Sequence, residues 1–189
     1  NFYSNEVNLN EDPNVTPDVP QEPEVPQEPD QGQQNTNVVG DMAQKGGEEI
    51  KKQAISYGIG IIDERKIDEV NIYEATKLAM KDAINNCLKK CKIDHILIDA
   101  MPLELDIPTT SIIKGDLKSI TISAASVIAK VTRDRTLDEL HEQFPMYDFK
   151  KNKGYPTKKH LEAIEEYGII NEHRRSYGPV KDYLEKKCK

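Results

Sequence analysis

Segments of strand length alternate with segments of helical periodicity along most of the chain, and few fold classes accommodate that order. Three short runs have the apolar, β-branched composition of strands: residues 55–62, 95–99 and 111–116. Three longer runs place apolar side chains at helical spacing: residues 71–90, 123–144 and 157–167. The alternation predicts an α/β fold in which at least some strands pair in parallel.

The expected helices carry start and stop signals. Asn71 precedes the first helix and Glu74 follows three residues later, which is the pattern of a capped amino terminus. Pro145 follows the second helix and Gly168 follows the third, and neither residue favours a continuing helix. The helices are therefore expected to end near these residues.

The first 46 residues differ in character from the rest. Prolines recur every third residue at positions 17, 20, 23, 26 and 29, a period that matches the polyproline II helix. Residues 1–50 hold 11 acidic residues and one basic residue (1 − 11 = −10), whereas the remaining 139 residues hold 25 bases and 22 acids (25 − 22 = +3). We expect residues 1–46 to be disordered and residues 47–189 to form the domain. An extended spacer is the simpler interpretation of the segment, and a ligand for an SH3-like groove is the alternative.

The slightly basic domain is compatible with a nucleic-acid partner. Other sequence features bear on metal binding and on the cellular compartment. The cysteines lack the spacing of a zinc site and are expected to be free thiols in a reducing compartment: Cys87, Cys91 and Cys188. The histidines also lack metal-ligand spacing: His95, His141, His160 and His173. No apolar run approaches the roughly 18 residues that span a membrane, and no leader follows Asn1. We therefore expect a cytoplasmic protein without a membrane anchor.

Two carboxylates stand at the ends of expected strands. Asp99 ends the run 95–99, and Asp116 ends the run 111–116. Ligands of open α/β sheets gather beyond the carboxyl ends of the strands, and carboxylate oxygens suit a hard divalent cation such as Mg²⁺. The alternative is that each aspartate simply begins a solvent-exposed turn.

Several separated motifs resemble bacterial ribonuclease HII, a type 2 ribonuclease H, in order and spacing. The resemblance covers about three-quarters of the chain and corresponds to the later two-thirds of that family. The motifs that carry it are Ile67–Ile72, Ile113-Lys-Gly-Asp116, Ile122–Arg135, Lys153-Gly-Tyr-Pro-Thr157 with His160, and His173–Pro179.

This resemblance implies an RNase H-like fold and an endonuclease that cuts RNA within RNA–DNA duplexes, including a single embedded ribonucleotide. In the family, four carboxylates hold two Mn²⁺ or Mg²⁺ ions, which activate a water and stabilise the leaving oxygen. Asp99 matches the third carboxylate and Asp116 the fourth. The implied partner is an RNA–DNA hybrid duplex, and we expect a monomer.

The resemblance also assigns nucleic-acid contacts. Tyr155 matches the tyrosine that packs on the sugar beside the ribonucleotide, and Ser123, Ser126 and Lys130 fall in a stretch near the substrate backbone. Each has a structural alternative: the serines allow close helix packing, Lys130 is a solvated side chain, and Tyr155 is a turn residue. We expect Asp134 to pair locally rather than to bind metal.

One element of the family pattern does not occur in these 189 residues. The family opens with a strand bearing an Asp-Glu-Ala-Gly-Arg-Gly motif, and the pair Asp63-Glu64 is not that motif because no Gly-Arg-Gly follows it. We therefore expect an incomplete sheet with uncovered apolar faces, and a polypeptide that is severely impaired or inactive alone. The alternatives to an active nuclease are a remnant that binds hybrids without turnover and an inactive fragment.

Overall fold

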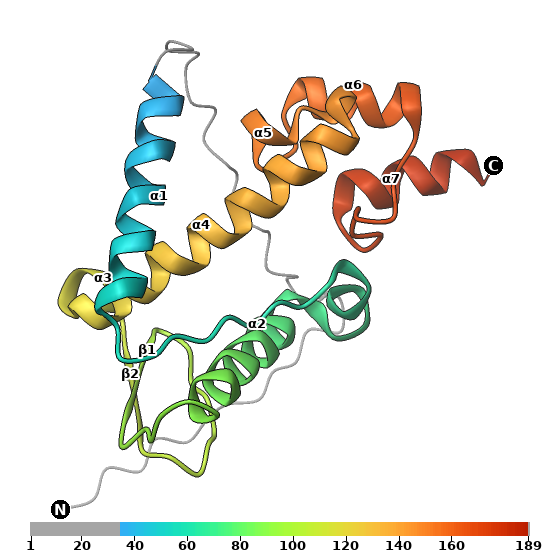
Figure 1. Cartoon of the computed structure of the whole chain (residues 1–189). Coiled ribbons are helices and arrows are strands. Elements are labelled where there is room, and N and C mark those ends of the chain that lie inside the picture. Colours follow the sequence, from blue (N-terminus) through green and yellow to red (C-terminus); the bar gives the residue numbers. More distant parts are fainter. Residues whose placement is uncertain (1–34, 189) are drawn as a thin grey trace, which may run out of the picture. The chain divides into compact units, whose positions relative to one another are not determined.

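The computed structural model describes residues 35–188, with side chains from Met42 onward. It is a helix-rich α/β arrangement with one small sheet (Figure 1). The elements in chain order are α1 Asn35–Gln53, α2 Glu64–Leu88, β1 Ile96–Asp99, β2 Thr109–Ile112, α3 Gly115–Lys118, α4 Ile120–Gln143, the 3-10 turn η1 Pro145–Tyr147, α5 Phe149–Asn152, α6 Lys158–Tyr167 and α7 Gly178–Lys187.

The two strands pair in parallel, as the alternation predicted. Their register places Ile96 opposite Thr109 and Asp99 opposite Ile112. The second strand is shorter than expected, because it ends at Ile112 and the chain turns through Lys114 at φ 55°. The prediction that Asp116 ends a strand is therefore wrong, since Asp116 lies in the first turn of α3.

The strand predicted over residues 55–62 is also wrong, because that segment joins no sheet in the described part of the chain. It packs on α2 instead. The carbonyl oxygen of Ile59 accepts a hydrogen bond from Nδ2 of Asn86 at 2.9 Å. A Cβ atom on Gly60 would lie 1.9 Å from the carbonyl oxygen of Ala79, so only glycine allows this approach. A strand-forming composition without a neighbouring strand thus leaves an extended segment held by helix side chains.

Helix α1 corrects the expected boundary at residue 46. Residues 1–34 lie outside the described part, and the expectation for them stays a prediction. Residues 35–46 are helical, so the expectation of disorder is wrong there. The helix lies against α4: a Cβ on Gly47 would be 3.4 Å from Val131, and Glu48 pairs with Arg135 at 2.7 Å (Figure 1). This tertiary contact offsets the weak helix propensity of a Gly-Gly pair.

The helix signals read from the sequence are confirmed. Oδ1 of Asn71 accepts from the backbone N–H of Glu74 at 3.1 Å, although Asn71 forms a kink inside the longer helix α2 rather than its start. The second helix begins three residues earlier than expected and ends before Pro145. Gly168 ends α6 at φ 88°, and the hydroxyl of Thr157 caps its start.

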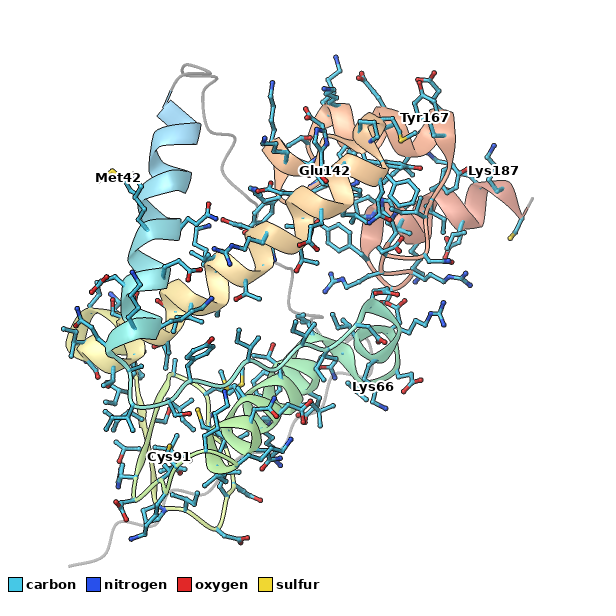
Figure 2. All side chains as sticks on the ribbon, in the orientation of Figure 1. Met42, Lys66, Cys91, Glu142, Tyr167 and Lys187 are labelled. Atoms are coloured by element: carbon cyan, nitrogen blue, oxygen red, sulfur yellow. The ribbon has the colours of Figure 1, made fainter. Side chains whose placement is uncertain are left out.

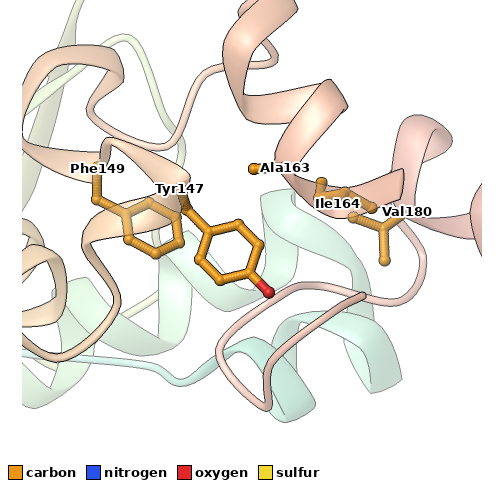
Figure 3. Packing of buried hydrophobic residues seen from close by; sticks show 5 residues of the cluster. All are labelled: Tyr147, Phe149, Ala163, Ile164 and Val180. Atoms are coloured by element: carbon orange, nitrogen blue, oxygen red, sulfur yellow. The ribbon is translucent and has the colours of Figure 1, made fainter. Parts of the chain in front are cut away.

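A cluster of buried side chains, called here the C-terminal core, lies between η1, α5, α6 and α7 (Figure 3). Its members are Tyr147, Phe149, Ala163, Ile164 and Val180. The terminal helix α7, which the sequence reading did not anticipate, contributes Val180. Aromatic stacking inside the core is close, with the rings of Tyr147 and Phe149 5.5 Å apart.

The three cysteines lie at or near the carboxyl ends of α2 and α7. Cys87, Cys91 and Cys188 are free thiols, and Cys91 lies just beyond the end of α2 (Figure 2). Among the helices of residues 35–188, none combines the length and the apolar character needed to cross a membrane.

Candidate functional site

The two candidate metal ligands lie at the end of β1 and the start of α3, which adjoin one another. Asp99 is the last residue of β1, and its Oδ1 accepts a hydrogen bond from the backbone N–H of Gly115 at 2.8 Å. Asp116 follows Gly115 directly in the chain. Gly115 is buried, and a Cβ there would come within 2.6 Å of Ile122, so glycine permits this junction. The hydrogen bond therefore places both aspartates at one corner of the molecule.

Both carboxylates are exposed and retain free acceptor capacity. Among the described residues, no donor bonds to Oδ2 of Asp99 or to the carboxylate of Asp116. Hard oxygen donors of this kind suit Mg²⁺ or Mn²⁺. Residues 42–188 contain no group of three or more Asp, Glu, His or Cys side chains placed to share an ion. The pair thus fits such a metal in donor chemistry and falls short of a full ligand set.

Tyr155 presents its ring to solvent from a tight turn. The side chain is 59% exposed, and the turn contains Gly154 at φ 84° and a hydrogen bond from Tyr155 N–H to the carbonyl oxygen of Asn152 at 2.8 Å. The guanidinium of Arg133 lies 5.9 Å from the ring centroid, and its Nη2 donates to the carbonyl oxygen of Lys153 at 2.8 Å. Tyr155 is therefore both a turn residue and an exposed aromatic surface backed by a cation.

The other predicted contacts lie along one face of α4. Spacings of three, four and three residues align Ser123, Ser126, Lys130 and Arg133. At 1.5 Å per residue, this row extends about 15 Å and ends at Arg133, beside Tyr155. Ser126 and Lys130 are exposed, whereas Ser123 is half-buried and its carbonyl oxygen accepts from the Ser126 hydroxyl at 2.8 Å. Tyr155 and the α4 residues thus form one row.

Asp134 behaves as expected, since its Oδ2 pairs with Nζ of Lys130 at 3.5 Å. Lys130 remains 68% exposed in spite of this ion pair. Arg133 was missed at the level of sequence, although its spacing from Lys130 marks the same helix face. Its contact with Tyr155 joins residues 22 positions apart and needed the tertiary structure.

A model of the family described as Ribonuclease HII matches residues 39–179. The chain belongs to the ribonuclease HII family. The match begins inside the segment that was expected to be disordered, in agreement with the helix α1 seen there.

Curated relatives support the same assignment. The chain is 58% identical over 139 residues to a ribonuclease HII of Bacillus cereus strain G9842, covering 74% of this chain and 53% of the relative. It is 58% identical over 138 residues to that of Bacillus thuringiensis strain Al Hakam, covering 73% and 53%. The chain spans about half the length of the curated relatives it matches.

A solved structure supports the fold. The ribonuclease H2 of Pyrococcus horikoshii OT3 superimposes with a TM-score of 0.65, covering 79% of this chain and 78% of that chain. The sequence identity is 23%, so this likeness bears on the fold alone. An incomplete RNase H-like α/β fold is therefore the fold class of the described residues, as predicted.

Asp68 is a further residue whose role the sequence did not reveal. Its carboxylate, on α2, accepts from the backbone N–H groups of Arg175 at 2.7 Å and Ser176 at 3.0 Å, and from the Ser176 hydroxyl. Burial alone would raise the pKa of Asp68, and the hydrogen bonds from Ser176 and Arg175 outweigh burial and lower it. Asp68 thus ties α2 to a loop more than 100 residues away.

Proposed function

We propose that this chain serves the ribonuclease HII reaction, the endonucleolytic cleavage of RNA in RNA–DNA hybrids, including single embedded ribonucleotides. The observation that carries the proposal is the junction of Asp99 and Asp116 through the Gly115 N–H, in a chain of this family. The exposed row on α4 that leads to Tyr155 supports a nucleic-acid partner.

Each side chain has a role in this proposal. Asp99 and Asp116 would hold a Mg²⁺ or Mn²⁺ ion, which when bound supplies a polarised water and offsets charge on the leaving oxygen. Ser123, Ser126 and Lys130 donate to phosphate oxygens, which positions the duplex without reading sequence. Tyr155 packs its exposed ring on a sugar, where the 2′-hydroxyl distinguishes RNA from DNA.

We further propose that this polypeptide alone cleaves hybrids poorly or not at all. It supplies two of the four carboxylates that the resemblance implies, and a two-metal displacement needs ligands on both sides of the scissile phosphate. The second candidate is therefore a hybrid-binding protein without turnover. The exposure of Tyr155 and Lys130 favours it, because binding requires these groups and not a full ligand set.

The test is cleavage of a DNA duplex bearing one ribonucleotide, with Mg²⁺ or Mn²⁺, beside an Asp99→Asn variant that reveals contaminating host enzyme. We expect the unsubstituted chain to cleave no more of the duplex than the Asp99→Asn variant does. Cutting by the unsubstituted chain that disappears in Asp99→Asn would show that the polypeptide is active and that the proposed impairment is wrong.

Binding is tested separately in EDTA, where the same duplex stays intact. We expect Tyr155→Ala and Lys130→Ala to weaken binding and the affinity to fall with added salt. Lys52→Ala, an exposed lysine on α1, is the matched control and should leave the affinity unchanged. Salt-insensitive binding, or equal effects of Lys130→Ala and Lys52→Ala, would contradict the proposed row of contacts.

A further inference from the structure

Two buried imidazoles touch inside the C-terminal core. Nε2 of His160 and Nε2 of His173 lie 3.1 Å apart, and the side chains are 5% and 7% exposed. The rings of Tyr147 and Phe149 pack on both, with centroid distances of 5.2–6.1 Å. Neither histidine belongs to the carboxylate corner or to the row on α4.

The backbone groups at the two ends of the pair determine where its protons lie. The N–H of Ile170 can only donate, so Nδ1 of His173, 3.1 Å away, must accept and carry no proton. The proton of His173 is then on Nε2, which donates to Nε2 of His160. The proton of His160 is then on Nδ1, which donates to the carbonyl oxygen of Tyr155 at 3.0 Å. When both rings are neutral, this is the only arrangement of protons that satisfies all three hydrogen bonds.

This chain of hydrogen bonds ends at the turn that presents Tyr155. The Tyr155 carbonyl oxygen also accepts from the N–H of Thr157 at 2.9 Å, so it has two donors. On the other side of the turn, Nδ2 of Asn152 donates to the carbonyl oxygen of Tyr147 at 2.6 Å. We propose that His160 and His173 are positioning residues that hold the Tyr155 turn in its binding geometry. The proposal rests on the proposed function.

A further proton breaks this arrangement. Protonated His173 could not accept from Ile170, and protonated His160 could not accept from His173, so N–H would face N–H. Burial, together with the neighbouring His160, lowers the pKa of His173 to about 4. Because the unfolded chain takes up this proton near pH 6.5, the contribution of His173 to stability declines as the pH falls from about 6.5 to about 4.

Other ionisable groups near the pair come from each surrounding element. Tyr147 of η1 packs on both rings, and burial raises its pKa. Asp148, which precedes α5, is paired with Lys159 of α6 at 2.8 Å. Arg174, next to His173, lies with its guanidinium 4.9 Å from the Tyr177 ring, and Tyr183 of α7 packs against the core.

The first experiment needs no nucleic acid. Hydrogen exchange of residues 153–157 is measured at pH 7 in the full chain, in His160→Leu and in His160→Asn. The asparagine Nδ2 can replace the Nδ1 donor to Tyr155, whereas leucine cannot. We expect faster exchange of these amides in His160→Leu and partial rescue in His160→Asn. Unchanged exchange in the folded His160→Leu variant would overturn the positioning role.

The second experiment measures affinity for the one-ribonucleotide duplex in EDTA. We expect His160→Leu to weaken binding about three- to tenfold, the equivalent of one hydrogen bond, and to have no further effect in a Tyr155→Ala background. We also expect the affinity of the unsubstituted chain to fall between pH 6 and pH 4, as His173 takes up a proton, more steeply than that of His160→Asn.

Two outcomes distinguish a failure of the positioning role from a failure of the proposed function. Additive effects of His160→Leu and Tyr155→Ala would overturn the positioning role and leave the proposed function intact. Absence of binding by the unsubstituted chain at every pH would overturn the proposed function, and with it the role of the pair in binding.

Discussion

The C-terminal core and the region around the sheet differ in how completely they bury their apolar side chains. In the core, Tyr147 and Val180 are each 2% exposed, and the buried polar side chains Asn152, His160 and His173 are all hydrogen-bonded. Around the sheet, Ile113, which follows β2, is 72% exposed and Ile120 is 87% exposed. One region therefore completes its packing within residues 137–184, and the other leaves apolar surface in water.

The difference shows that similar local patterns need not give similar packing. Both regions have the apolar periodicity of globular sequence, but burial requires facing elements. The core has several helices that close on one another, whereas the sheet has two strands of four residues, a size that is marginal alone in water. At about 25 cal/mol per Å² of apolar surface, each exposed apolar side chain stabilises the fold less than it would if it were buried.

The largest expected effect comes from emptying the core. Tyr147→Ala should lower the free energy of unfolding by about 3–5 kcal/mol, because it removes a buried ring and its hydrogen bond to the carbonyl oxygen of Gly168. Urea denaturation followed by circular dichroism measures this. Tyr147→Phe, which loses only the hydroxyl, should cost about 0.5–1.5 kcal/mol and keeps the test informative if the alanine variant does not fold. Equal costs for the two variants would contradict the packing described for the core.

A second prediction concerns the segment that packs on α2. Gly60→Ala should cost about 1–3 kcal/mol, because the new Cβ would overlap the carbonyl oxygen of Ala79. The matched control is Gly46→Ala in α1, where a Cβ meets nothing within 4 Å and the helix should gain about 0.5–1 kcal/mol. A neutral Gly60→Ala would mean that the segment does not lie against α2 in solution.

Asp68 connects α2 to the loop before α7 and should have an intermediate effect. Asp68→Asn should cost about 1–2 kcal/mol at pH 7, since one amide cannot accept all the hydrogen bonds from Arg175 and Ser176. The pKa of Asp68 is lowered by folding, so its stabilisation is present above the unfolded pKa of about 3.9 and is lost as the pH falls through the lower folded value. Denaturation curves from pH 7 to pH 2.5 follow this loss. Asp82→Asn, an exposed carboxylate on the same helix, should reproduce neither effect.

The smallest effect is expected where the apolar side chain is already in water. Ile120→Ser should change the free energy of unfolding by less than about 0.5 kcal/mol and reduce self-association, because the isoleucine is 87% exposed. Denaturation and sedimentation measure the two quantities. A loss above about 2 kcal/mol would show that the region around the sheet is packed in solution and would remove the contrast with the core.

The features that depend on local sequence signals were the easiest to predict. The helix ends before Pro145 and at Gly168 follow from residues that do not continue a helix, and the Asn71 cap marks a kink inside α2 rather than a helix start. The parallel pairing of residues 96–99 with residues 109–112 follows from the order of elements. Asp99 was placed at the end of its strand, and the local pairing of Asp134 was anticipated.

The errors share a physical cause. The run 55–62 has strand-forming residues, but a strand exists only when a neighbour pairs with it, and no described segment does so. Residues 35–46 belong to the helix α1, which contacts α4 through Gly47 and Glu48, although the few apolar residues of that segment suggested disorder. Asp116 lies in the helix α3 rather than at the end of a strand, because the chain turns at Lys114.

Sequence alone determined the α/β class, the family resemblance, the two carboxylates and the candidate contacts of Tyr155 and α4, because these depend on residue type, order and spacing. Tertiary structure alone decided which groups meet: Asp99 with the Gly115 N–H, Arg133 with Tyr155, Asp68 with Ser176 and His160 with His173. Such contacts join residues 13 or more positions apart, where periodicity carries no information and the closing of the chain on itself sets the distance.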